Sequence, residues 1–131
     1  MNKIFFLLLL FTAFSFAQKV NKKNKIIRGF VFEDYLIPAQ VDVSVKGTDL
    51  KTFTDADGKF IIEAKLDDVL VISPYGQRPI EITVNEKNCY TTHLFKDTGL
   101  YYYTKKAARA IKKIRRKAMR KYKQGFYDCD D

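Results

Sequence analysis

The stretch Thr54-Asp-Ala-Asp-Gly-Lys-Phe60, TDADGKF, lies near the middle of the 131-residue chain and decides which fold surrounds it. Its Asp-x-Asp-Gly pattern occurs in calcium-binding loops and at the tips of β-hairpins. A calcium loop of the helix–loop–helix kind needs oxygen ligands at several alternate positions and a bidentate carboxylate at its end. Asp55 and Asp57 are the only closely spaced acids here, and Lys59 and Ile61 stand where further ligands are expected. The spacing therefore predicts no metal.

A β-hairpin turn accounts for the same residues. Carboxylates such as those of Asp55 and Asp57 accept hydrogen bonds from backbone N–H groups, and Gly58 tolerates the positive φ of a tight turn. Thr54 and Phe60 then begin two paired strands. We therefore predict that Asp55, Asp57 and Gly58 form a structural turn.

The segments on both sides of this turn alternate between apolar and polar residues. Val41, Val43 and Val45, for example, are separated by polar residues, which is typical of a half-buried strand. The pattern predicts seven strands, over residues 26–33, 41–45, 51–54, 59–64, 69–73, 80–84 and 90–95. Short strands with a turn every 8 to 12 residues or so predict an all-β fold, a β-sandwich or small barrel.

The first residues have the pattern of a secretory signal peptide. Met1-Asn2-Lys3 is positively charged, an apolar run follows, and Ser15-Phe16-Ala17 offers small residues at a cleavage site. A retained membrane anchor is the alternative, although the run is shorter than the roughly 20 residues that span a bilayer. We expect an exported protein that starts at Gln18 and is periplasmic, associated with the outer membrane, or secreted. The predicted organisation is a signal peptide (1–17), a basic arm (18–25), a β-sandwich (26–96) and an aromatic linker with a basic helical tail (97–131).

Charge is concentrated at the two ends of the expected mature chain. Residues 18–25 carry a net charge of +4, residues 26–104 carry −4, and residues 105–131 carry +8. Blocks of like charge are more often interaction tails than parts of a core. The 11 cations of residues 105–131 predict an acidic partner for the C-terminal tail.

The C-terminal block predicts one basic amphipathic helix. Thr104 is a candidate N-cap, no Gly or Pro interrupts residues 105–124, and Gly125 is a C-terminal stop. The apolar stripe of this helix would contain Ala107, Ala110, Ile111, Ile114, Ala118 and Tyr122. The candidate contacts for an anion or a partner are Lys105, Lys106, Arg109, Lys112, Lys113, Arg115, Arg116, Lys117, Arg120, Lys121 and Lys123.

Three tyrosines precede this helix, at positions 101–103. One interpretation is that they pack the helix against the sandwich, since buried aromatic rings dominate contact energies. The alternative is that they are exposed beside the cations and stack on sugars or bases.

The cysteines and the histidine do not form a recognisable catalytic or metal site. Cys89 and Cys129 allow one intramolecular disulfide in an exported protein, while two free thiols or a bridge between chains remain open. His93 lies four residues after Cys89, but no second Cys/His pair completes a zinc site. No nucleophile–base motif accompanies His93. The sequence therefore predicts a protein that is not an enzyme, with no cofactor, metal or small-molecule substrate.

The linked motifs resemble the carboxypeptidase regulatory-like domain. They include RGFVFED from residue 28, PAQVDV from residue 38, VKGT from residue 45, TDADGKF from residue 54 and DVLVIS from residue 68. The resemblance covers about residues 26–95 and implies a seven-stranded, transthyretin-like Greek-key sandwich. The module also occurs at the start of TonB-dependent outer-membrane receptors. Its motif residues are structural, so the resemblance implies no catalytic residue; Pro74 departs from it, standing where the family often has an aromatic or small residue.

Three functions are compatible with these features. The first is an exported binding or accessory module that docks to another protein of the bacterial envelope, with the tail as a contact arm. The second is a binder of anionic surfaces, in which the tail meets lipopolysaccharide, acidic lipid or nucleic acid. The third is an accessory subunit of an exported peptidase.

Overall fold

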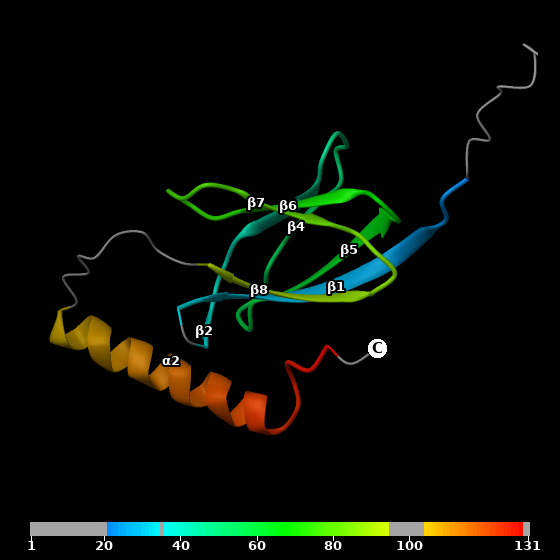
Figure 1. Ribbon diagram of the computed structural model, residues 1–131. Coiled ribbons are helices and arrows are strands. Elements are labelled where there is room, and N and C mark those ends of the chain that lie inside the picture. The colour runs from blue at the N-terminus through cyan, green and yellow to red at the C-terminus, as the bar shows by residue number, and fades with distance from the viewer. Residues whose placement is uncertain (1–20, 35, 95–103, 130–131) are drawn as a thin grey trace, which may run out of the picture.

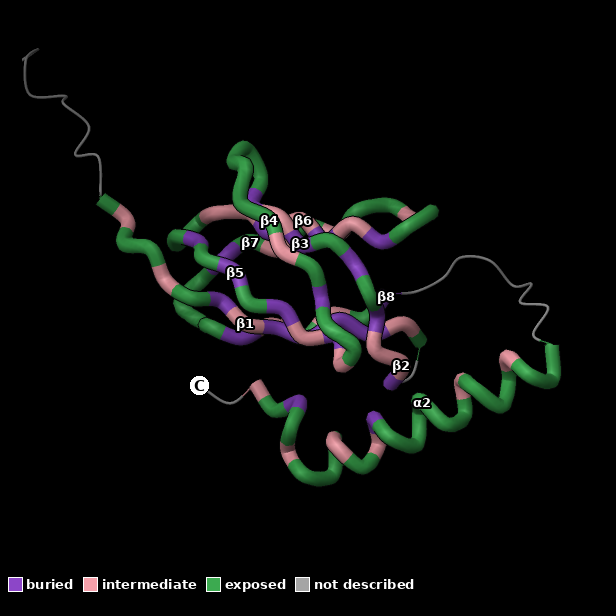
Figure 2. The backbone as a smooth tube through the Cα atoms, turned by 180° about the vertical axis from the view of Figure 1, so that it is seen from behind, coloured by how far each residue is buried: buried purple, intermediate pink, exposed green. Residues whose placement is uncertain are grey.

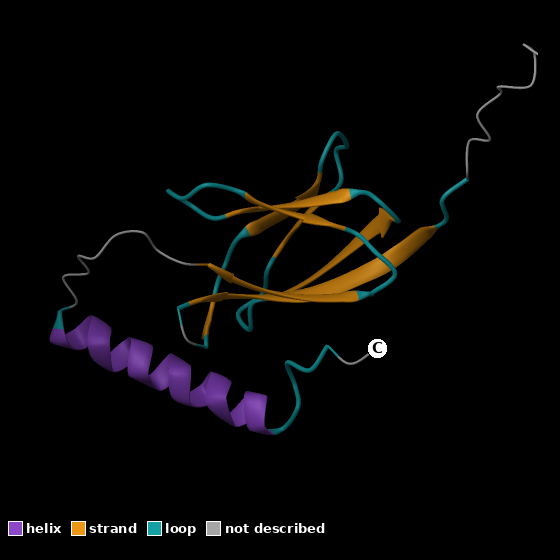
Figure 3. Cartoon of the chain, in the orientation of Figure 1, coloured by secondary structure: helices purple, strands orange, loops and turns teal. Residues whose placement is uncertain are grey.

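The computed structural model describes residues 21–34, 36–94 and 104–129, which form two β-sheets and one helix (Figure 1). The expected signal peptide and the tyrosines at positions 101–103 lie outside the described residues. The two sheets face each other, and the helix lies on the outer side of the first sheet (Figure 3). The prediction of a mostly β sandwich with a C-terminal helix is confirmed.

The first sheet is built around the long strand β1 (Asn24–Glu33). It pairs antiparallel with β2 (Ile37–Pro38) and β5 (Lys59–Lys65), and parallel with β8 (Cys89–Leu94). The second sheet has the order β4-β3-β6-β7 and is antiparallel throughout. Its strands are β4 (Lys51–Phe53), β3 (Asp42–Val45), β6 (Val69–Ser73) and β7 (Ile80–Thr83).

The prediction of seven strands was wrong, because the sheets contain eight. The additional strand is β2, which has only two residues and pairs with the end of β1. Two residues are too few to show an alternating pattern, and a proline usually indicates a turn or an edge. The sequence therefore predicted a turn where an edge strand forms.

The start of β1 also differs from the prediction. The strand begins at Asn24, so it includes the last two residues of the predicted basic arm. The Lys25 ammonium donates a hydrogen bond to the backbone oxygen of Lys87 at 3.1 Å, and Lys22 forms an ion pair with Asp67 at 2.5 Å. Part of the basic arm is thus fixed on the sandwich.

The main core fills the space between the two sheets (Figure 2). Strand β3 buries alternate residues, as its period-two pattern predicted, and the wholly apolar run of β6 also buries alternate residues. Their buried side chains meet those of β1 and β5, and the largest of these include Ile27, Phe60, Leu70 and Ile72. This alternation fixes the register of both sheets, since a shift of one residue would turn every apolar side chain outward.

A second, smaller core lies on the outer face of the first sheet. Its members are Phe30, Phe32, Leu36, Cys89, Ala118 and Tyr127. Strand β1 is therefore buried on both faces towards its C-terminal end, which explains why aromatic residues occupy the side of β1 that faces away from the main core. The C-terminal helix and the chain after it provide the cover.

The helix α2 (Lys105–Lys123) has the ends that the sequence predicted. The Thr104 hydroxyl accepts a hydrogen bond from the backbone N–H of Ala107 at 3.1 Å, which caps the N-terminus. Gly125 adopts a φ of +75° just beyond the C-terminus. Within the described ranges, no helix combines the length and the apolar character that crossing a membrane requires.

The contact face of α2 differs in part from the predicted stripe. Ala118 is buried, and Ala107 and Ile111 are half-buried. Ile114 is 45% exposed and Tyr122 is 53% exposed. Ala110 is also exposed, so the interface is narrower than the predicted stripe.

Candidate functional site

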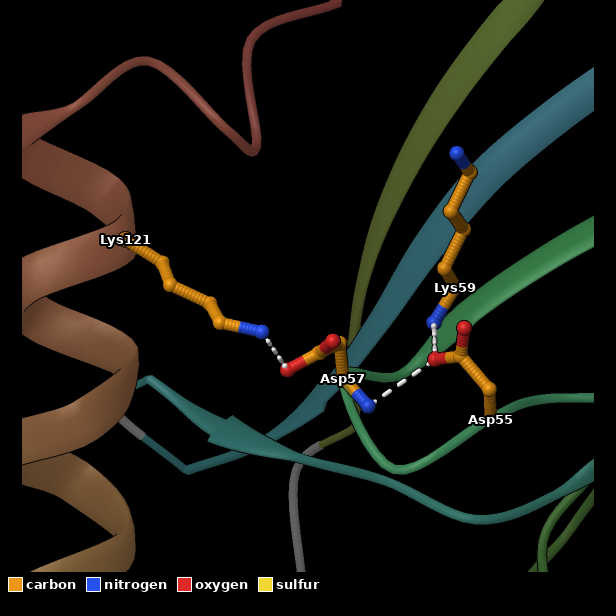
Figure 4. Close-up of polar contacts among 4 residues, drawn as sticks. All are labelled: Asp55, Asp57, Lys59 and Lys121. Carbon is orange, nitrogen blue, oxygen red and sulfur yellow. Dashed lines mark hydrogen bonds and ion pairs between the residues drawn. The ribbon is translucent and has the colours of Figure 1, made fainter.

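The turn between β4 and β5 is held by its own aspartate. The Asp55 carboxylate accepts hydrogen bonds from the backbone N–H groups of Asp57 and Lys59, at 2.9 and 3.0 Å (Figure 4). The backbone N–H of Gly58 donates to the Asp55 carbonyl oxygen at 2.9 Å. The geometry is that of a hairpin turn, and the described residues contain no group of three or more potential metal ligands.

Thr54 anchors the start of this turn inside the protein. Its hydroxyl donates to the Ala39 carbonyl oxygen at 2.6 Å and accepts from the backbone N–H of Val41 at 2.8 Å. Thr54 is only 2% exposed, so these bonds satisfy a buried polar group that would otherwise destabilise the fold. These hydrogen bonds therefore anchor the turn at one end of the sandwich.

Gly58 is required at this position for two reasons that can be separated by experiment. The first reason is the positive φ of +73°, which Gly47 shares with a φ of +76°. The second is a steric clash, because an added Cβ at Gly58 would lie 2.4 Å from the Val31 carbonyl oxygen. An added Cβ at Gly47 would meet nothing within 4 Å, so Gly47 provides the comparison. We expect Gly47→Ala to lower the free energy of unfolding by about 1 kcal/mol. Gly58→Ala should cost about 2 kcal/mol more, because the backbone must also shift. Urea unfolding of both variants measures the difference, and equal losses would contradict it.

Lys121 ties the helix to this turn. Its ammonium lies 2.6 Å from the Asp57 carboxylate, and each of the two side chains is 27% exposed (Figure 4). The same ammonium lies 4.7 Å from the centre of the Phe126 ring. Lys121 was predicted to contact a partner, but it has an acidic partner within the chain. The sequence gave no signal for this pair, since 64 residues separate its members.

A disulfide fixes the segment that follows the helix. Cys89 at the start of β8 is bonded to Cys129, with 5.2 Å between the two Cα atoms. The alternatives of free thiols or a bridge between chains do not describe this structure. Because Cys89 is in the disulfide, it is not available to bind a metal together with His93. His93 instead stacks on Phe32, with 5.5 Å between the ring centres.

Tyr127 is the buried centre of the contact between the C-terminal segment and the first sheet. Its ring packs edge-on against Phe30, Phe32 and Phe126, with ring centres 5.1, 4.9 and 5.0 Å away. Its hydroxyl is buried and has no hydrogen-bond partner among the described residues. Burial raises the pKa of Tyr127 from 10.0 to about 12, and the carboxylates of Asp57 and Asp55 add to the rise. Tyr127 was not predicted from the sequence, because it lies after the helix in a segment whose apolar residues show no regular spacing.

The remaining basic residues of α2 face solvent. Apart from Lys121, every lysine and arginine of the helix is exposed. The exposed set is Lys105, Lys106, Arg109, Lys112, Lys113, Arg115, Arg116, Lys117, Arg120 and Lys123. No acidic residue interrupts the helix, so these ten cations form one continuous positive surface, which we call the basic face.

Two hollows flank α2 where it meets the sandwich. One, of about 570 Å³, is lined by residues that include Gln40, Asp57, Lys117 and Tyr127. The other, of about 650 Å³, runs between the helix and the end of the β1–β2 connection. The sequence could not predict either hollow, since each forms only when the helix is placed against β2.

Comparison with known proteins gives limited matches. No protein-family profile matches the chain. A crystal structure of a 9R-lipoxygenase from Cyanothece PCC8801 aligns with a TM-score of 0.36 and 15% identity, covering 76% of this chain and 21% of that one. At that level of similarity the alignment carries no argument about fold or activity.

A sequence match to one curated protein is closer. The chain is 37% identical over 70 residues to the TonB-dependent receptor SusC of Bacteroides thetaiotaomicron. The match covers 53% of this chain but 7% of the receptor, so the receptor is a far longer protein. The chain is thus similar, over about half of its length, to a small segment of a TonB-dependent receptor.

Proposed function

We propose that the protein is a non-catalytic, exported binding module of the bacterial envelope, which docks to an acidic partner protein through the basic face of α2. The observation that carries the proposal is the anchored, uninterrupted array of ten exposed cations. An isolated helix with this composition would repel itself, because neighbouring like charges are destabilising. Packing and covalent attachment to the sandwich offset that repulsion.

The anchoring matters for binding. The disulfide, the Lys121–Asp57 ion pair and the burial of Tyr127 hold the C-terminal end of the helix and the segment that follows it. A pre-organised charged surface loses less conformational entropy on binding than a disordered tail. The tail is therefore better described as a fixed docking surface than as a flexible arm.

The family and the location are part of the same proposal. The SusC match and the two-sheet architecture support a transthyretin-like sandwich of the carboxypeptidase regulatory-like kind. The match to a receptor, the predicted signal peptide and the disulfide support an envelope location, since disulfides persist in oxidising compartments. The lack of a nucleophile–base motif around His93 favours a binding role over catalysis.

A charge-neutralised variant tests the proposal better than a truncated one. Ending the chain at Thr104 would remove Tyr127 and Cys129, and would open the second core. The variant K106Q/K113Q/R120Q instead removes three exposed cations from the helix side opposite the sandwich. The control K51Q/K65Q/R78Q removes the same number and kind of exposed charges from the sandwich.

We expect the unmodified protein to bind heparin, an acidic polymer, at low salt and to be released at ~0.5 M salt. The helix variant should bind at least about tenfold more weakly at low salt, because the attraction depends on closely spaced cations. The sandwich control should bind nearly as well as the unmodified protein. Equal losses for both variants, or no heparin binding at all, would overturn the proposed role of the basic face.

A further inference from the structure

The larger hollow beside α2 combines an apolar floor with a cationic rim. It has a volume of about 650 Å³. Ile37, Ala108, Ile111 and Met119 supply apolar surface. The charged lining residues are Lys112, Arg115, Arg116 and Asp34. We call this hollow the lipid groove, for the ligand that we assign to it below.

The charges around the groove favour an anion. Among the described residues that line the groove, three cations outnumber one carboxylate. Two of the cations are arginines, whose planar guanidinium groups bind phosphate and carboxylate oxygens in pairs. A phosphate group at the rim matches this arrangement.

The apolar floor indicates that the ligand has an apolar part as well as an anionic group. Nucleic-acid bases bind by stacking on aromatic rings, and the described residues that line the groove include no aromatic side chain. Ile111 is half-buried and Met119 packs against the second core, so the floor is fixed. Fixed aliphatic surface next to clustered cations suits a molecule with an anionic head and a hydrocarbon chain.

The orientation of α2 bears on how a lipid would be held. The most buried residues of its stripe, such as Ala118, face the sandwich. The helix therefore cannot lie in a membrane with that stripe in the acyl layer, as free amphipathic helices do. In the groove, apolar side chains of the helix that are not covered by the sandwich lie next to several cations.

We propose that the lipid groove binds an anionic phospholipid of a membrane, with the phosphate at Lys112, Arg115 and Arg116 and the start of an acyl chain on Ile37 and Ile111. This inference goes beyond the proposed function, since it assigns a second ligand, a lipid, to the edge of the basic face that borders the groove. It adds that one side of the helix discriminates lipid from other polyanions.

Two matched triple variants test the groove. K112Q/R115Q/R116Q removes the rim cations, and R109Q/K113Q/R120Q removes one lysine and two arginines of the same helix that do not line the groove. Both are compared by melting temperature, which must match within a few degrees. Binding is measured to phosphatidylglycerol vesicles, to phosphatidylcholine vesicles and to heparin.

We expect the unmodified protein to bind phosphatidylglycerol vesicles and not phosphatidylcholine vesicles. The rim variant should bind the anionic vesicles at least about tenfold more weakly than the variant of the cations outside the groove, a difference of 1.4 kcal/mol. On heparin the two variants should lose affinity equally. A second pair places one carboxylate in the groove, A108E, or outside it, A110E; only A108E should weaken vesicle binding strongly.

A soluble probe tests the apolar floor. A short-chain phosphatidylglycerol should bind at least about tenfold more tightly than glycerol phosphate, because each buried methylene strengthens binding about fourfold. Equal affinity for the two would overturn the role assigned to Ile37 and Ile111.

The outcomes separate the inference from the proposed function. Heparin binding without vesicle binding, or equal effects of the two triple variants on vesicles, would overturn the lipid groove and leave the acidic-partner function standing. Those results would fit a protein partner, or a groove filled by residues 95–103 of the same chain. Absence of both heparin and vesicle binding would overturn both proposals.

Discussion

Removal of the Cys89–Cys129 disulfide is expected to lower the free energy of unfolding by up to about 4 kcal/mol, because the bond closes a large loop in the unfolded chain. The two cysteines are 40 residues apart in the sequence, and the bond joins β8 to the segment that carries Tyr127. Without it, the second core is held by non-covalent contacts alone. Urea unfolding with and without reductant measures the loss.

The double variant C89S/C129S provides the control. Its stability should equal that of the reduced protein within about 1 kcal/mol, and reductant should not change it. Helix α2 should lose its protection from amide hydrogen exchange before the sandwich does, since the bond fixes the end of the tail. A uniform loss of exchange protection across the helix and the sandwich would contradict a local stabilising role of the disulfide.

Replacing Tyr127 with alanine is expected to destabilise the protein by about 3 to 5 kcal/mol, as for other large buried aromatic side chains. The ring contacts Phe30, Phe32 and Phe126, and 6% of the residue is exposed. Tyr127→Phe keeps the ring and removes only the buried hydroxyl that lacks a partner. That variant should be neutral or stabilised by about 1 kcal/mol, because an unsatisfied buried polar group is costly.

The pH dependence of stability, compared between the unmodified protein and Tyr127→Phe, gives a second measurement. The folded state raises the pKa of Tyr127 to about 12 from its usual 10.0, so the folded protein holds its phenolic proton more tightly. The associated stabilisation is complete below pH 10 and is lost as the pH rises from about 10 to about 12, by up to about 3 kcal/mol. Tyr127→Phe should lack this part of the decline. Identical pH profiles for the two proteins would contradict the assigned environment.

The sequence predicted features that depend on local chemistry. The turn at Gly58, the alternation in β3 and the caps of α2 are set by residues close together in the chain. Backbone φ preferences, strand periodicity and capping act over a few residues, so they can be recognised without a structure. These features define the sandwich and the helix.

The features that fix the helix to the sandwich could not be predicted in this way. The Lys121–Asp57 pair, the β1–β8 pairing and the burial of Tyr127 all join distant parts of the chain. Phe30 and Phe32 gave an indirect signal, because aromatic residues on the second face of a strand require a cover. The sequence did not indicate which segment supplies it.

The position of β1 has a consequence for how the chain folds. This strand begins the described structure, yet its neighbour β8 comes near the end of the sandwich and its outer cover comes last of all. Forming such non-local contacts costs loop-closure entropy, and proteins rich in them fold slowly. During synthesis, Phe30 and Phe32 must stay uncovered until the segment with Tyr127 has been made, which is a condition that favours aggregation. We therefore expect the protein to need a holding chaperone until Tyr127 covers these two rings.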